Sequence, residues 1–174
     1  MENLSYPIGK FTFDPDSTPE KRAAFIGDIE SLPARLSAAV AGLSASQLDT
    51  PYRDGGWTVR QVVHHLADSQ INAFVRFKLG LTADSPRICA FDQDAWARTA
   101  DSAADVALSL AIIGGVHGRW AVLLRSLSPA DFARTYLHPE RGPEPLERTL
   151  QLYAWHGNHH LAHIAGLRQR KGWR

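Results

Sequence analysis

The chain has 174 residues, of which 44% are hydrophobic, so it is long and apolar enough for one domain with a substantial core. Its 19 basic and 18 acidic residues give a net charge of +1, without the long Lys/Arg run that would favour nucleic-acid binding. The lone Cys89 excludes an internal disulfide, and no apolar stretch matches a signal peptide or a membrane span. We therefore expect a soluble, cytoplasmic protein without a membrane partner.

The N-terminal third predicts an extended arm followed by a long helix. Residues 1–17 contain prolines and a glycine and form the expected arm. Thr18 is a plausible N-cap, and Pro19 suits the first helical position. Apolar residues then recur at helical spacing to residue 43, although Pro33 is expected to kink or break this helix. A capping box at 44–47 predicts one further helical turn.

The second helix has the clearest start in the sequence. Thr58 and Gln61 form a capping box, and Trp57 and Val62 occupy the two positions of a hydrophobic staple. One apolar face then continues to about residue 79. A long connection, 80–101, follows this helix.

Two more helices are predicted in the C-terminal half. Ser102 is expected to cap a third helix ending near residue 127, and Ser128 to open another short turn. An irregular stretch through 138–143 leads to a last helix that begins near Pro145. Four main helices without an alternating strand pattern predict an all-α bundle, with 1–174 as a single domain. The long connection lets the second and third helices lie parallel.

The last helix carries four of the eight histidines within residues 156–163. Two pairs, His156/His160 and His159/His163, have the four-residue spacing that places imidazoles on one helix face. A helical wheel puts His156 and His160 at the edge of the apolar arc and turns the other pair toward the polar side. His156 and His160 are therefore the predicted inward-facing pair.

A third ligand is expected from the second helix, where His65 lies near the apolar edge and His64 points away. The predicted site of His65, His156 and His160 would hold one divalent metal ion and leave a coordination position open. Three imidazoles suit zinc, nickel, iron or copper. Any single histidine at such an edge is more often a core or surface residue, so the convergence of three carries the prediction.

The remaining histidines of these segments, His64, His159 and His163, are expected to be exposed or to support the ligands. Gly157 stands where a metalloprotease HExxH motif needs its glutamate, which argues against peptidase activity by that route.

Several polar and aromatic residues are secondary candidates. Asp68, one turn after His65, is a candidate catalytic proton shuttle, with an ordinary surface role as the alternative. Arg119 is a candidate for binding a substrate carboxylate, or for an interhelical salt bridge. Tyr153 is a candidate for lining the substrate cavity, or a core aromatic. Trp57 and Trp155 are candidates for the mouth of the same cavity, or core aromatics, and Asn72 is a candidate for its edge, or a solvated side chain. Cys89 is interpreted as incidental, and the sequence assigns no role to His117 or His138.

Longer motifs resemble a known family. Residues 50–69 (TPYRDGGWTVRQVVHHLADS), 117–120 (HGRW) and 155–163 (WHGNHHLAH), with 4–9 (LSYPIG) at the N-terminus, resemble the YfiT branch of the DinB/YfiT-like metalloenzymes. The likeness covers nearly the whole chain.

The resemblance implies a four-helix bundle in up-down-down-up order, assembled as a homodimer. It also implies a three-histidine centre using zinc or nickel, whose ligand positions fall on His65, His156 and His160. Family members are described as metal-dependent hydrolases of small molecules, but the family also includes S-transferases and an isomerase that use low-molecular-weight thiols. We expect a hydrolase in which the metal activates water. The alternatives are an S-transferase that binds a thiolate at the metal, and a bundle that binds metal or ligand without turnover.

Overall fold

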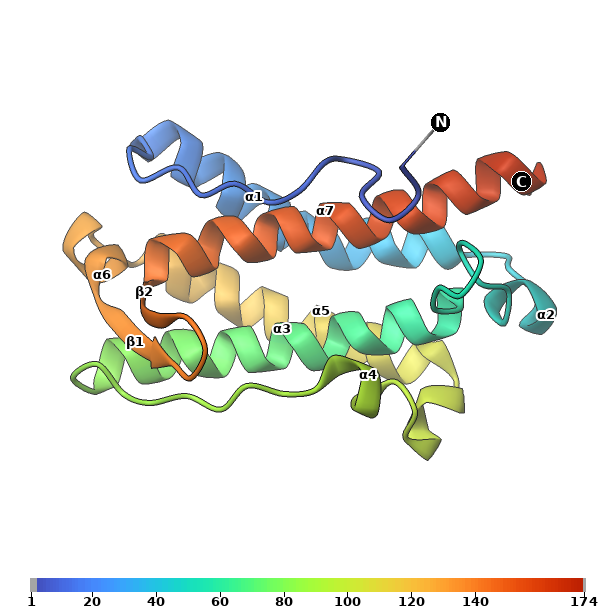
Figure 1. Ribbon diagram of the computed structural model, residues 1–174. Coiled ribbons are helices and arrows are strands. Elements are labelled where there is room, and N and C mark those ends of the chain that lie inside the picture. The colour runs from blue at the N-terminus through green and yellow to red at the C-terminus, as the bar shows by residue number, and fades with distance from the viewer. Residues whose placement is uncertain (1–2, 174) are drawn as a thin grey trace.

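Four long helices form a bundle in the computed structural model, which describes residues 3–173. They are α1 (Pro19–Val40), α3 (Val59–Thr82), α5 (Val106–Arg125) and α7 (Leu146–Lys171). Each helix packs against two others: α1 contacts α5 and α7, and α3 contacts the same two helices. The helices α1 and α7 run in one direction and α3 and α5 in the other, as predicted (Figure 1). Residues 1, 2 and 174 of the predicted domain lie outside the described part.

Local capping determines where the first two long helices begin. The Thr18 side chain accepts a hydrogen bond from the Lys21 amide, and the Thr58–Gln61 capping box is complete. The third helix differs from the prediction, since Asp105 rather than Ser102 caps it, by accepting from the Ala107 amide. Residues 100–103 instead form a separate 3-10 turn, η1.

The helix α1 continues through Pro33, so the predicted break is wrong. Buried apolar side chains lie on both sides of this proline, including Ile29, Leu32 and Leu36. Their packing against the bundle offsets the backbone hydrogen bond that a proline removes.

The long connection between α3 and α5 returns along α3, which allows the two helices to lie parallel (Figure 1). It contains the short helix α4 (Gln93–Trp96) and η1 (Ala100–Ala103). Arg60 and Gln61, at the start of α3, donate to the carbonyl groups of Ala104 and Ala97. Two more single turns, α2 (Ala45–Leu48) and α6 (Pro129–Ala133), match the predicted short helical segments.

A two-stranded hairpin replaces part of the predicted irregular stretch before α7. Strands β1 (Thr135–His138) and β2 (Gly142–Pro145) are antiparallel and pair Thr135 with Pro145. Each strand has only four residues and β2 contains two prolines, so no period of two was visible in the sequence.

The core consists of two clusters of buried apolar residues that meet near the middle of the bundle. One contains Val63, Leu66 and Leu161, and the other contains Trp120 and Ala154. On α7 the boundary falls between Ala154 and Leu161, which is the segment that carries His156 and His160.

The helix α5 is long and apolar enough to cross a membrane by length and composition alone, which the sequence analysis did not anticipate. In the bundle one side of this helix is buried, with Ile113, Trp120 and Leu124 packed against α1 and α3. Its outer side leaves Leu108 and Val122 exposed.

Candidate metal centre

Three histidine side chains converge between α3 and α7. The Nε2 atom of His156 lies 3.2 Å from Nε2 of His65 and 3.2 Å from Nε2 of His160. All three ligand atoms lie within 4.8 Å of one another, and no other group of this kind was found among the described residues. These are the three histidines that the sequence analysis selected.

The spacing of these nitrogen atoms fits a metal ion. Zinc bonded tetrahedrally at about 2.0–2.1 Å requires its ligand nitrogens to be about 3.3 Å apart. The imidazole rings meet edge to face, with interplanar angles of 63°, 66° and 77°.

Burial keeps these imidazoles neutral, which is the form that binds metals. It lowers the pKa of His65 to about 4. The pKa values of His156 and His160 lie well below the ordinary histidine value, mainly because of burial and secondarily because of the neighbouring histidines.

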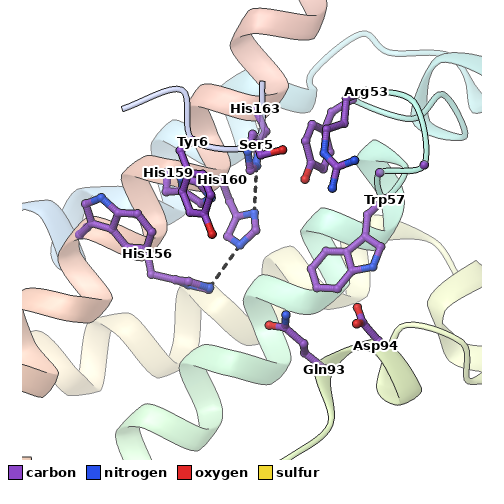
Figure 2. Close-up of a pocket in the computed structure, with 14 residues that line it drawn as sticks. Ser5, Tyr6, Arg53, Trp57, Gln93, Asp94, His156, His159, His160 and His163 are labelled. Carbon is purple, nitrogen blue, oxygen red and sulfur yellow. Dashed lines mark hydrogen bonds between the residues drawn. The ribbon is translucent and has the colours of Figure 1, made fainter. Parts of the chain in front are cut away.

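The other two histidines of α7 are buried beside the ligands, which agrees with the expected supporting role and not with the alternative of exposure. The Nδ1 atoms of His163 and His160 are 3.4 Å apart (Figure 2). The His163 ring stacks on the Tyr52 ring, with the ring centroids 4.0 Å apart. His159 stacks on Trp155, with ring centroids 4.5 Å apart. His163 therefore contacts the ligand His160 from behind and helps to orient it.

A cavity of about 440 Å³ opens onto His156 and His160. Figure 2 shows Arg53 on one side of it and Gln93 and Asp94, from α4, on the opposite side. The aromatic wall includes Trp57, whose ring lies 4.5 Å from that of His65. The histidine cluster thus faces a polar cavity of small-molecule size.

Sequence reasoning missed most of this cavity wall. Tyr6 comes from the N-terminal arm, Arg53 from the loop before α3, and Gln93 and Asp94 from the crossover. Loops of this kind carry no periodicity, and only the family motifs, residues 4–9 and 50–69, singled out the segments of Tyr6 and Arg53.

Arg119 does not line the cavity next to the histidines, and its role as a substrate ligand stays a prediction. It is exposed on α5, where its guanidinium lies 5.5 Å from the Phe74 ring centroid. The described residues also provide no salt bridge for it. Arg119 faces outward because its neighbour Trp120 occupies the buried side of α5, and adjacent residues in a helix point in different directions.

Asp68 is half-buried on α3 and does not line the cavity. Burial raises its pKa, with a further contribution from Asp101, so its electrostatic neighbours lie toward the crossover. Its catalytic role stays a prediction. Asn72, one turn further along, donates to the Asp68 carbonyl.

Tyr153 is a buried core aromatic rather than part of the cavity next to the histidines. Its ring lies 5.8 Å from that of His156, and its hydroxyl oxygen is 3.4 Å from Nη1 of Arg76. It lines a second, smaller cavity together with His138.

Two other histidines connect helices. His64 lies 2.7 Å from the Ser109 hydroxyl through Nδ1 and 3.2 Å from the Ala104 carbonyl through Nε2, so it joins α3 to α5. His117 Nδ1 donates to the Ile29 carbonyl and joins α5 to α1.

A bundle with parallel helix pairs and an inward-facing three-histidine cluster is the architecture of one known class of proteins. The model of the DinB superfamily matches residues 28–164. The chain therefore belongs to the DinB superfamily.

Relatives of known sequence match over their full length. "Putative metal-dependent hydrolase YfiT" of Bacillus subtilis is 50% identical over 173 residues, covering 98% of this chain and 97% of its own. A protein of Bacillus mycoides, also named a "putative metal-dependent hydrolase", is 49% identical, covering 99% of this chain and 100% of its own.

A solved structure confirms the fold. The structure of YfiT from Bacillus subtilis, described as a probable metal-dependent hydrolase with an unusual four-helix bundle topology, superimposes with a TM-score of 0.96. The match has 49% sequence identity and covers 99% of both chains.

Proposed function

We propose that this protein is a metal-dependent hydrolase of small molecules, with one divalent ion held by His65, His156 and His160. The observation that supports this most directly is that Nε2 of His156 lies 3.2 Å from Nε2 of both His65 and His160, beside a polar cavity. The names of the full-length relatives point to the same activity. Zinc is our first choice of metal and nickel the second, since three imidazoles suit either ion.

A divalent ion at this position would supply Lewis-acid activation of water and of the scissile bond. The protein's own contribution is to hold three neutral imidazoles in fixed orientations. Trp57 contacts the His65 ring, and His163 contacts His160 from behind. Arg53 and Asp94, on opposite sides of the cavity, provide groups of opposite charge that can orient a polar substrate.

Metal analysis tests the ligand assignment. Protein purified without chelator should contain about one ion per chain, as expected for a three-ligand site. His156→Ala should lose that ion. His64→Ala is the matched control, because His64 is a buried histidine next to a ligand and bonds to Ser109 instead. Equal metal content in all three proteins would refute the assignment.

An activity panel tests the reaction class. Ester and amide substrates should be turned over by the zinc- or nickel-loaded protein, and His156→Ala should lower the rate about 100-fold or more. The same panel pairs small thiols with electrophiles. Turnover of that pair alone would replace the hydrolase by an S-transferase, and metal retention without any turnover would favour a non-catalytic bundle.

The proposal extends to the assembly and the location. The family resemblance implies a homodimer, and the exposed apolar side chains Val75, Leu108 and Val122 on the neighbouring helices α3 and α5 are suited to contact a second copy. The lone, exposed Cys89 fits a reducing cytoplasm, where disulfides are rare.

A further inference from the structure

Arg76 is a buried cation without a counter-charge. It is only 7% exposed, and no carboxylate in the described residues 3–173 forms a salt bridge with it. The two buried carboxylates, Glu144 and Glu147, do form salt bridges. Glu144 pairs with both Arg141 and Arg148, and Glu147 pairs with Arg22.

Only some of the N–H donors of the Arg76 guanidinium form hydrogen bonds within the protein. Nη2 donates to the Cys89 carbonyl at 3.2 Å, and Nη1 donates to the Tyr153 hydroxyl at a long 3.4 Å. An arginine has five N–H donors in a planar fork. An isolated buried charge is costly, and the cost is normally offset by an opposite charge with good hydrogen bonds.

Arg76 lines a small cavity of about 200 Å³. His138 and Arg141 from the β-hairpin, Tyr153 from α7 and Phe91 from the crossover also line it. This volume accommodates a carboxylate or a phosphate group with some water.

The charges around the cavity leave an excess of positive charge. Arg141 and Arg148 share the single carboxylate of Glu144, whereas Arg76 has none. Among the residues that line the cavity the single acid is Glu140, which is exposed, against the two arginines Arg76 and Arg141. Burial and the two cavity arginines keep the pKa of His138 below its ordinary value, despite the opposing effect of Glu140 and Glu144.

A purely structural role does not require this charge. Holding the Cys89 carbonyl against α3 needs only a neutral donor, and an amide side chain supplies one. The planar guanidinium is instead the group that recognises carboxylates and phosphates through paired hydrogen bonds.

We propose that Arg76, Arg141 and His138 form an anion-binding pocket that accepts the carboxylate or phosphate group of a small molecule. The pocket is separate from the histidine cluster, and Tyr153 stands between them. Its hydroxyl contacts Arg76 while its ring lies 5.8 Å from the ring of His156. The inference does not depend on the metal or on the reaction class.

Calorimetric titration of the full, metal-free chain tests the pocket. Inorganic phosphate and succinate are the two probes, each at constant ionic strength set with sodium chloride. At least one should bind saturably, and the preferred probe identifies the anion class. Arg76→Gln should weaken that binding about tenfold or more, because it removes a charge-assisted contact.

Arg134→Gln is the matched control. Arg134 also donates to backbone carbonyls, those of Gly80 and Ala83, but lies outside the pocket, so its loss should leave the affinity unchanged. If Arg76→Gln does not fold by circular dichroism, Arg141→Gln provides the same test. This residue is exposed on the hairpin, and Glu144 keeps Arg148 as its partner.

A His156→Ala variant separates this pocket from the histidine cluster and should bind the anion as the parent does. The proposal is wrong if neither probe binds saturably to the folded parent. It is equally wrong if the pocket variants bind as tightly as Arg134→Gln, or if only His156→Ala loses binding.

Discussion

Replacing Gly157 with alanine tests how closely α7 approaches α1 beside the histidine cluster. Gly157 lies on α7 between the ligands His156 and His160, and its backbone faces Leu32 of α1. A Cβ atom at this position would lie 2.8 Å from Cδ2 and 3.1 Å from Cδ1 of Leu32. Leu32 is itself only 2% exposed, so its side chain has little space into which it can move.

Two opposing effects determine the size of the change. Alanine in a helix interior is more favourable than glycine by about 1 kcal/mol. Overpacking a well-filled core costs about 1–3 kcal/mol. We therefore expect Gly157→Ala to lower the free energy of unfolding by about 0–2 kcal/mol, rather than to raise it.

Gly166→Ala provides the control within the same helix. Its added Cβ would meet only the end of the flexible Arg170 side chain, at 3.1 Å. It should stabilise the protein by about 0.5–1 kcal/mol through helix propensity alone. Urea denaturation followed by circular dichroism gives both values, and the two variants should differ by about 1–3 kcal/mol.

A double-mutant cycle completes the test. In a Leu32→Ala background the added methyl group enters the space that the leucine side chain vacates, so Gly157→Ala should become neutral or stabilising. Equal stabilisation by Gly157→Ala and Gly166→Ala in the parent would refute the close approach of α7 to α1.

Three further variants probe other contacts. His64→Ala leaves the buried Ser109 hydroxyl without its hydrogen-bond partner. It should lower the free energy of unfolding, measured by urea denaturation, by about 1–3 kcal/mol, while metal content is retained. Unchanged stability would contradict the link between α3 and α5. Thr58→Ala removes the cap shared with Gln61 and should cost about 1 kcal/mol by the same assay, whereas Thr58→Ser should cost clearly less. Val122→Glu places a charge on the exposed apolar side of α5 and should convert a dimer to a monomer in light scattering; a mass equal to that of the parent would argue against that interface.

Features that depend on neighbouring residues could be predicted from the sequence. The caps at Thr18 and Thr58 involve residues within three positions, and the structure contains both. The inward rotation of His156 and His160 follows from the phase of a single helix. Their proximity to His65 needed one further assumption, that α3 and α7 pack together.

Features that depend on distant segments could not be predicted in this way. A helical wheel assigned His159 and His163 to the polar side of α7, but Tyr6 and Tyr52 pack there, and the two histidines are only 7% and 4% exposed. The wheel describes one helix and contains no information about what covers it. The same reason explains why the contact of Arg119 with Phe74 and the cavity wall formed by α4 could not be predicted.

The distribution of the three ligands along the chain determines when the cluster can exist. His156 and His160 are one helical turn apart, so any α7 helix brings them together, even an isolated one. His65 is 91 positions away from His156 and joins them only after α3 has docked against α7. The position of the His65 imidazole nitrogen in the cluster therefore depends on tertiary structure. During synthesis the cluster is completed only once most of α7 has emerged, and under denaturing conditions it is lost as soon as these two helices separate.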